Sequence, residues 1–473
     1  MVDKYEHINA AVGFAELVRT TLGPRGMNKM IMGKTTILTN DGATILNAIK
    51  GGNPIIELFK NLAKSQELEV GDGTTTATLI SGQLLSNALF LIQKGLHPTT
   101  IISGYNIANQ NALGFLDRMK ENPDKEKIIK TCFGTKLGGT LVDKLTTELL
   151  KVKNYDNLRF FNMDNSNPLE SRHYNGLVFK GHTLNERMKS EVSGRIAVLD
   201  FPTNVQMDKF NATTAKDLAE VTDASTKIKK DIVDKLIEND VRCVFYTDTN
   251  VEIESFLTDA GITGIVIFER DNLDWICKTT MANACSSINQ IDSNHLGDGK
   301  MHYEKQKIGN RGTIYLKGIG AVETFILNGS TSQVLEEMDR SIHDVVSLLK
   351  GNLDCVVGAG AIEIELANYL MNLAKQVGGK EQLAIEKFAE AIESIPLIIA
   401  ENCGLDAIEI LTNLKTLHMK GKKDMGVDLV GISDARERGI LEPVLVKIHA
   451  VNSATNVATL ILKLDQILQG EEK

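Results

Sequence analysis

The chain has 473 residues, 42% of them hydrophobic and 24% charged, and its formal net charge is −9. This length exceeds the size at which one hydrophobic core stops growing, so we expect two or three domains, and the composition excludes a disordered chain. The sequence contains no Lys/Arg-rich block of the kind that follows a phosphate backbone, which argues against nucleic acid as a partner.

The six cysteines stand apart, with no C-x-x-C pair and no zinc-type spacing with histidine. They are typical of reduced thiols in the cytosol. The stretch Met1–His7 has no basic-then-apolar signal pattern, and no apolar run approaches the length of a membrane span. We therefore expect a soluble, cytoplasmic protein that does not interact with membranes.

The first third of the chain is predicted to be helical, with tight glycine turns between helices. A helix is expected from about Thr74 to Lys94, because apolar side chains recur there at helical spacing. It ends at Gly95, with Pro98 just beyond, which is ordinary helix-stop chemistry.

Between Gly176 and Val322 short apolar runs alternate with helical segments, which predicts a small α/β domain. The strand-like runs are residues 196–199, 241–246 and 265–268, followed by 312–317 and 324–327, and the helical segments are 231–238 and 251–260. The polar segment 202–222 is typical of an exposed flap.

From about Gln333 onward helical periodicity returns. We expect helices at Ala361–Lys375 and Glu381–Ser394, with Pro396 interrupting the second. The order is thus helical, then α/β, then helical. This order permits both helical ends to form one body with the α/β module inserted in the middle.

The stretch Gly71–Thr76 reads G-D-G-T-T-T and opens the helix predicted from Thr74. Free backbone N–H groups at a helix start favour an anion, and glycine lets phosphate come close. Asp72 would supply a hard oxygen ligand to Mg²⁺, and the threonines would donate to phosphate oxygens. The alternative is that Asp72 is an ordinary N-cap. The Walker A pattern is absent, so a nucleotide site here is not a P-loop.

Three further fragments combine glycines with charged residues or a helix start. Thr21–Lys29 joins two glycines and cations, as a loop close to phosphates would, Thr39–Thr44 ends an apolar run in a carboxylate and a glycine, and Gly358–Gly360 precedes the helix at Ala361. Taken singly, each is explained equally well by a turn between helices, a hairpin turn or helix packing.

Together and in this order, the four fragments closely resemble the group II chaperonin family. The family patterns G-P-x-G-M-x-K, T-N-D-G-A-T-I, G-D-G-T-T and G-G-G-A-x-E-x-E-L correspond here to Gly23–Lys29, Thr39–Ile45, Gly71–Thr75 and Gly358–Leu366. The resemblance covers nearly the whole chain, including the tail segments 400–406, 426–428 and 439–447. Within the family the chain is most similar to the theta class of subunits of the eukaryotic cytosolic complex called CCT or TRiC, in residues 26–30, 161–165, 275–279 and 384–391.

The resemblance implies an α/β multidomain chaperonin fold. Residues 1–121 and 355–473 would form a mostly helical, discontinuous equatorial domain that binds ATP. Residues 122–175 and 323–354 would form a small intermediate hinge domain. Residues 176–322 would form an α/β apical domain that binds substrate proteins, with a helical lid protrusion near 202–230.

The resemblance also implies the site residues. Asp72 would hold Mg²⁺, Asp344 would orient or deprotonate the attacking water, and Asp41 would lie near the metal and that water. Of the nucleotide-binding residues, Lys136 would sense the γ-phosphate and Glu442 would approach the ribose hydroxyls. The complete nucleotide-binding set is Gly23, Pro24, Gly26, Gly73, Thr74, Thr75, Thr76, Lys136, Gly358, Gly360 and Glu442. The chain departs from the family in Ala359, which replaces the middle of three glycines.

The implied function is that of an ATPase subunit in a hetero-oligomeric double ring, which uses ATP to close a built-in lid and fold cytosolic proteins such as actin and tubulin. Because the metal ligand and Asp344 lie in different domains, hydrolysis would require domain closure. Two alternatives remain open: a structural ring subunit that binds nucleotide with little hydrolysis, and an unrelated phosphotransferase without a P-loop.

Overall fold

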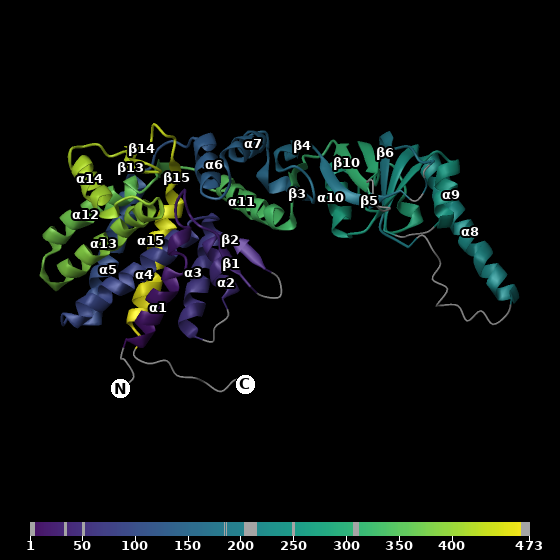
Figure 1. Cartoon of the computed structure of the whole chain (residues 1–473). Coiled ribbons are helices and arrows are strands. Elements are labelled where there is room, and N and C mark those ends of the chain that lie inside the picture. Colours follow the sequence, from purple (N-terminus) through teal and green to yellow (C-terminus); the bar gives the residue numbers. More distant parts are fainter. Residues whose placement is uncertain are drawn as a thin grey trace. The chain divides into compact units, whose positions relative to one another are not determined.

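The structure is a computed structural model that describes residues 5–32, 36–49, 53–183, 185, 187–202, 215–247, 251–305 and 312–464. The chain divides into two compact units. One, called here the helical unit, comprises Met1–Thr147 and Ser330–Lys473, and the other, the α/β unit, comprises Glu148–Gly329 (Figure 1). The mostly helical discontinuous body with an α/β insertion that the sequence predicted is confirmed.

The helical unit is built from both ends of the chain. Its helices are α1 (Glu6–Glu16), α2 (Gly42–Ala48), α3 (Pro54–Val70), α4 (Thr74–Gln93), α5 (Pro98–Arg118), α6 (Lys125–Gly134), α7 (Gly139–Leu149), α11 (Ser332–Lys350), α12 (Ala361–Val377), α13 (Gly379–Asn402), α14 (Ala407–Met419) and α15 (Val444–Leu462). Three two-stranded antiparallel sheets accompany them: β1 (Lys29–Ile31) with β2 (Ile37–Thr39), β12 (Cys355–Val357) with β15 (Leu441–Pro443), and β13 (Met425–Asp428) with β14 (Gly431–Asp434).

Helix α4 lies at the centre of this unit, packed against α1, α3, α13 and α15. One continuous core joins buried side chains of α1 near one end of the chain to those of α15 near the other. The fully buried Tyr105 and Phe388 pack edge to face in this core, with ring centroids 5.6 Å apart. The two ends of the chain therefore share one core.

Two of the described helices, α4 and α15, are long and apolar enough to cross a membrane by length and composition alone. The prediction that no apolar run approaches that length was therefore too strong. Most of each apolar stretch is buried, 61% in α4 and 56% in α15. A central core helix that packs on all sides is expected to be apolar around its whole circumference.

Helix α13 corrects a second prediction, because it continues through Pro396 to Asn402. The ring of Pro396 is buried, and it packs so closely on Gly360 that a Cβ at position 360 would lie 2.6 Å from the proline Cβ. Tertiary packing thus holds the helix together across the proline, although a proline removes one helical hydrogen bond.

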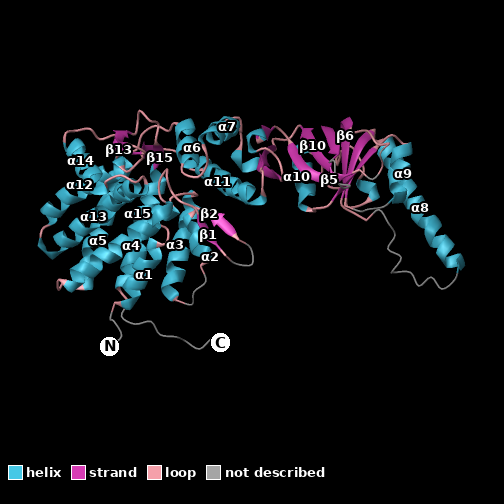
Figure 2. Cartoon of the chain, in the orientation of Figure 1, coloured by secondary structure: helices cyan, strands magenta, loops and turns pink. Residues whose placement is uncertain are grey.

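The α/β unit contains a closed barrel with strand order β10-β5-β8-β7-β6-β9 and a three-stranded sheet, β3-β11-β4 (Figure 2). The barrel strands are β5 (Leu177–His182), β6 (Glu191–Leu199), β7 (Val241–Tyr246), β8 (Thr263–Ile267), β9 (Gly297–Lys305) and β10 (Gly312–Gly318). The second sheet uses β3 (Leu158–Met163), β4 (Arg172–Tyr174) and β11 (Glu323–Asn328). Helices α8 (Ala215–Glu238), α9 (Val251–Asp259) and α10 (Asp271–Thr280) complete the unit.

Strands β6, β7 and β8 are parallel, and their apolar stretches 196–199, 243–246 and 263–267 are buried on both faces, whereas the first half of β6 is polar and partly exposed. Along β7, Cys243 and Phe245 belong to one buried cluster, while Val244 and Tyr246 belong to the other. The predicted strands are confirmed, except that β8 ends at Ile267 and Phe268 is exposed.

The predicted lid segment, 202–230, lies partly outside the described residues, because residues 203–214 are not described. From Ala215 the segment belongs to α8, which is much longer than the helix predicted at 231–238. A role as a lid stays a prediction, as do the residue boundaries of three separate domains.

Candidate nucleotide-binding site

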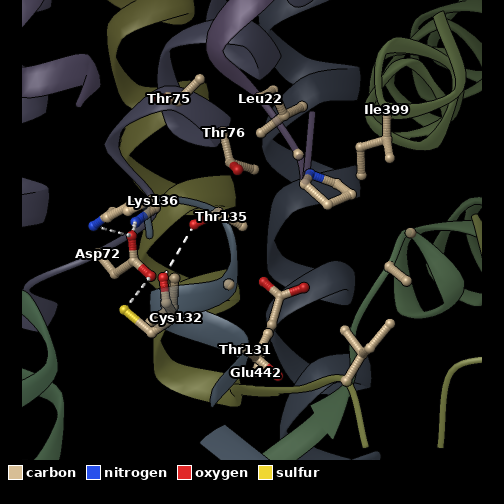
Figure 3. A pocket seen from close by; sticks show the side chains of 18 of the residues that line it. Leu22, Asp72, Thr75, Thr76, Thr131, Cys132, Thr135, Lys136, Ile399 and Glu442 are labelled. Atoms are coloured by element: carbon tan, nitrogen blue, oxygen red, sulfur yellow. Dashed lines mark hydrogen bonds and ion pairs between the residues drawn. The ribbon is translucent and has the colours of Figure 1, made fainter. Parts of the chain in front are cut away.

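A pocket of about 370 Å³ opens in the helical unit, a volume in the range usual for small-molecule sites. Of the residues predicted to form the site, those that line it are Gly23, Pro24, Asp41, Asp72, Gly73, Thr74, Thr75, Thr76, Lys136, Gly360 and Glu442. Gly26, Gly358 and Asp344 do not line it. Figure 3 shows Asp72, Cys132 and Lys136 gathered in one cluster, with dashed lines from Asp72 to Cys132 and Lys136.

Asp72 lies between two glycines that have left-handed backbone conformations, with φ of 72° at Gly71 and 82° at Gly73. A Cβ at Gly71 would lie 2.6 Å from the Cβ of Ser347 on α11, and one at Gly73 would lie 2.6 Å from Cγ1 of Val446 on α15. The G-D-G sequence is therefore required sterically, because two helices pack directly against this turn.

The alternative that Asp72 is the N-cap of α4 is wrong. Gly73 occupies the cap position, and no side chain caps the helix. The Asp72 carboxylate instead accepts a hydrogen bond from the backbone N–H of Gly73 through Oδ1, at 2.8 Å. The first-turn amides of α4 are thus left to an anion in the pocket, which the helix dipole also favours.

A second helix start, that of α2, meets the start of α4 at the pocket. Asp41 is the N-cap of α2, and its Oδ2 accepts hydrogen bonds from the backbone N–H and the hydroxyl of Thr44, at 2.7 and 2.6 Å. Gly42 permits the approach, because a Cβ there would lie 2.6 Å from the hydroxyl of Thr75. Helices α2 and α4 therefore direct positive dipole ends toward one place.

Lys136 follows the end of α6 and contacts two carboxylates. Its Nζ lies 2.5 Å from Oδ2 of Asp344 on α11 and 3.8 Å from Oδ1 of Asp72. The side chains of Lys136 and Asp344 are only 11% and 17% exposed. Thus Asp344 does not line the pocket but contacts Lys136, which does.

The electrostatics of this group follow from burial and from close charges. Burial raises the pKa of Asp344 to about 7, against the opposing effect of the Lys136 charge. Burial by itself would lower the pKa of Lys136, but the charges of Asp344 and Asp72 outweigh it and hold that pKa well above its ordinary value. Asp344 is therefore a carboxyl whose protonation changes near neutral pH, as a general base requires.

Sequence reasoning missed Cys132, which lines the pocket and donates its thiol hydrogen to Oδ2 of Asp72 at 3.4 Å. Burial and the nearby Asp72 charge raise the pKa of Cys132 well above its ordinary value, so the group is a neutral donor. Gln66 was also missed; its side-chain amide donates to the backbone oxygen of Asp72 at 2.9 Å. Neither contact leaves a local signal in the sequence.

The opposite part of the pocket is built from the second half of the chain. Glu442 on β15 forms an ion pair with Lys447 on α15, and Lys447 also pairs with the buried Glu363 on α12. Asp428 lines the pocket and pairs with Arg438, with Oδ2 and Nη2 2.8 Å apart. Glu363, Asp428, Arg438 and Lys447 were not predicted as site residues, although the tail motifs contain Asp428 and Lys447.

The glycine turn before α12 is left-handed at two successive residues, Ala359 with φ of 56° and Gly360 with φ of 82°. Ala359 lines the pocket, and its carbonyl accepts a hydrogen bond from the N–H of Val427 at 2.8 Å. The methyl group that departs from the family pattern is thus accommodated at the cost of backbone strain. Gly26 lies in a different turn, Gly23–Gly26, where its N–H donates to the carbonyl of Gly23 at 2.9 Å.

Among the described residues, no group of three or more His, Cys, Asp or Glu side chains is arranged to hold a metal ion by itself. Mg²⁺ commonly takes one or two protein carboxylates and completes its octahedron with phosphate oxygens and water. Asp72, with its 35% exposed carboxylate in the pocket, fits that donor set, and Asp41 lines the same pocket.

The uncapped start of α4, the glycine at the start of α2, a pocket-lining carboxylate and a buried lysine are features typical of a phosphate-binding site of the nucleotide-binding class, without a P-loop. The model of the TCP-1/cpn60 chaperonin family matches residues 14–472. The chain therefore belongs to the TCP-1/cpn60 chaperonin family, whose members are ATP-hydrolysing chaperonins.

Individual relatives agree with the family match. A thermosome subunit of Pyrococcus horikoshii is 32% identical over 500 residues, which cover 98% of this chain and 91% of that protein. The thermosome subunit alpha of Archaeoglobus fulgidus is 32% identical, covering 99% of this chain and 92% of that protein. The thermosome subunit alpha of Thermoplasma acidophilum is 30% identical, covering 98% and 91%. The chain is thus a chaperonin subunit of the thermosome, or group II, type.

Proposed function

We propose that the pocket binds ATP with its phosphates at the starts of α2 and α4 and its nucleoside toward β13 and β15. The single observation that carries this proposal is the contact chain from Asp72 through Lys136 to Asp344. It joins a pocket-lining carboxylate to a buried carboxyl with a pKa near neutrality. A phosphate-binding end and a proton acceptor are the two parts that hydrolysis requires.

In the proposed mechanism Asp72, with Asp41 beside it, holds Mg²⁺, which when bound neutralises charge on the phosphate oxygens. Gly73 and Thr74–Thr76 donate backbone and hydroxyl hydrogens to those oxygens. Lys136 transfers its contact from Asp344 to the γ-phosphate, since an ammonium on a flexible stem follows a negative charge. Asp344 then orients the attacking water and accepts its proton.

The finer identity is also a proposal. Thermosome relatives are named as subunits, which supports assembly into rings. The resemblance of residues 26–30, 161–165, 275–279 and 384–391 supports a place as the theta subunit of the hetero-oligomeric, cytoplasmic CCT complex. Unfolded actin- and tubulin-like proteins would then be its clients, bound by the apical domain, and the segment 202–230 would close over them as part of a lid.

The proposed domain boundaries are 1–121 and 355–473 for the equatorial, 122–175 and 323–354 for the intermediate, and 176–322 for the apical domain. The metal ligand and Asp344 fall in different domains under this division. Hydrolysis would then occur only after the intermediate domain closes, which couples the ATP cycle to lid movement.

Native sizing and electron microscopy of the chain, purified gently with a tag from its own cells, test the assembly. We expect a double ring with related chains. A lone monomer that hydrolyses ATP would overturn the proposal and favour the phosphotransferase alternative.

Photoreactive labelled ATP then assigns hydrolysis to this chain within the ring. Asp344→Ala should reduce ADP formation on the chain by roughly 10²-fold or more while leaving labelling by ATP intact. Glu336→Ala, on an exposed position of the same helix α11, is the control. Labelling without ADP formation in the wild-type chain would instead identify a structural subunit with little hydrolysis.

A further inference from the structure

Three charged side chains form a buried cluster at the β15 end of the pocket. Nζ of Lys447 lies 2.7 Å from Oε1 of Glu363 and 2.6 Å from Oε2 of Glu442. Lys447 and Glu363 are 8% and 5% exposed, whereas Glu442 is 27% exposed. Both Glu442 and Lys447 line the pocket. The cluster therefore exposes the Glu442 carboxylate to a ligand, while Lys447 and Glu363 stay buried behind it.

The Glu442 carboxylate is held through its Oε2 by Lys447. Gly358 leaves room for its Oε1, because a Cβ there would be 2.5 Å away. A carboxylate fixed in this way accepts hydrogen bonds with a defined geometry and loses little entropy when a donor arrives.

Lys447 is in turn fixed by Glu363, which extends from the first turn of α12. The cluster therefore joins α12, β15 and α15 through one ammonium. Its two carboxylates and one ammonium carry a net negative charge, which suits a hydroxyl donor and disfavours a phosphate at this end of the pocket. A cavity of about 10 Å³, lined by Thr76, Glu363 and Lys447, gives room for roughly one water beside the cluster.

We infer that Lys447 and Glu363 are positioning residues that hold Glu442 as the acceptor for a sugar hydroxyl, which makes the site selective for ribonucleotides over deoxyribonucleotides. This inference rests on the proposed function, because it takes the nucleoside to lie at β15. A site built to receive a hydroxyl rejects an analogue that lacks it more strongly than an apolar site does, since its buried acceptor is then left unpaired.

The test measures dissociation constants of ATP, 2′-deoxy-ATP and 3′-deoxy-ATP for the full-length chain in the assembly in which it purifies. We expect the wild-type chain to prefer ATP over one of the deoxy analogues by about tenfold or more. Lys447→Met should remove most of this preference while Glu442 itself is unchanged. Glu363→Gln should reduce it partly, because Lys447 then loses one of its two anchors.

Two further variants separate the causes. Lys415→Met is the matched control, because Lys415 pairs at 2.7 Å with the equally buried Glu393 away from the pocket, and it should leave the preference intact. The double variant Glu363→Gln with Lys447→Met keeps the buried charge balanced, and it serves where the single lysine variant fails to fold. It should also lose the preference.

Glu442→Leu, which removes both acceptor oxygens, distinguishes this inference from the proposed function on which it rests. If Glu442→Leu loses the preference for ATP while both lysine variants keep it, the positioning role is refuted and the placement of the nucleoside stands. If Glu442→Leu keeps the preference, the nucleoside does not contact Glu442, and both ideas are overturned. A wild-type chain with equal affinity for all three nucleotides has the same consequence.

Discussion

Replacing Lys136 with methionine removes the ammonium between Asp344 and Asp72 and keeps most of the side-chain volume. The Lys136 and Asp344 side chains are 11% and 17% exposed, so their ion pair is mostly shielded from water. Removing one partner of such a pair leaves an uncompensated buried charge, which costs about 3–5 kcal/mol. We expect Lys136→Met to reduce the stability of the helical unit by about this amount at pH near 8, without nucleotide.

The cost should depend on pH in a defined direction. The pKa of Asp344 in the folded chain, about 7, lies above its ordinary value of 3.8, so the folded chain takes up a proton on Asp344 as the pH falls through 7. The raised pKa therefore opposes folding above pH 7, and this penalty is relieved toward pH 4. At pH about 5.5 Asp344 is neutral in wild type and variant alike, and the loss should shrink to about 1.5–3 kcal/mol, the worth of one hydrogen bond to a charged group.

Thermal unfolding at both pH values measures the effect, followed by far-UV circular dichroism for helix and by fluorescence for Trp275. This is the only tryptophan in the sequence and lies on α10 of the α/β unit. Its transition therefore serves as an internal control. In a unit of this size each kcal/mol corresponds to roughly 1.5–2 °C. Lys120→Met, which removes an exposed ion pair with Asp117, should change neither transition.

Two results would refute this reasoning. One is a loss of stability that is equal at both pH values, because the ionisation of Asp344 would then not matter. The other is strict additivity in a cycle with Asp344→Asn. Groups in contact should instead show a coupling energy of about 0.5–3 kcal/mol.

Two further predictions concern the turn that carries Asp72. Gly73→Ala should destabilise the helical unit by about 1–3 kcal/mol and weaken ATP binding, because its Cβ would strain the backbone and lie 2.6 Å from Val446. Gly95→Ala is the control. Gly95 has a φ of 92° but open space around it, so this variant should retain ATP binding. Isothermal titration calorimetry separates them, and equal affinity in both variants would contradict the steric argument. Cys132→Val should raise the Mg²⁺ concentration required for half-maximal hydrolysis several-fold, and Cys132→Ser should restore it, because a hydroxyl can donate to Asp72 as the thiol does. A magnesium requirement that is the same in all three forms would count against this role.

The sequence was most informative where one physical factor dominates. Helix α4 was predicted within one residue of its observed end, because apolar periodicity, a glycine start and a glycine stop agree there. The long helix α8 was largely missed, because its first half is mostly polar and was included in the predicted flap, although Leu218, Ala219 and Val221 recur there at helical spacing. Strand β9 was missed for a similar reason: it contains two glycines and several charged residues and fully buries only Met301 among its long apolar side chains.

The prediction that Pro396 interrupts its helix was wrong because local propensity takes no account of the residue that packs against the proline. A proline normally ends a helix, but this one lies in the core against Gly360, whose lack of a side chain provides the space. The need for glycine at position 360 and the tolerance of proline at 396 both follow from the close contact between these two residues. Because they are far apart in the sequence, neither segment alone predicts that contact.

The motif residues of the pocket were located through a family resemblance, whereas the residues that support them were not. Cys132 contacts Asp72 from 60 positions away, whereas Gln66 and Lys447 lie close in sequence to Asp72 and Glu442 but on separate helices, α3 and α15, that turn back toward them. Periodicity and spacing report on neighbours along a helix or strand, so they carry no information about such contacts. Only the three-dimensional structure could add these residues.

Contacts between distant segments also explain why the pocket and the core of the helical unit are not separable. The turn at Asp72 fits between α11 and α15 only because Gly71 and Gly73 lack side chains, and both helices come from the part of the chain after the α/β unit. Asp72 is therefore positioned only after the two ends of the chain have folded together. A ligand that binds this folded pocket must stabilise the whole helical unit, by about 2.7 kcal/mol at a concentration one hundred times its dissociation constant. Ligand binding and folding of this unit are consequently linked equilibria.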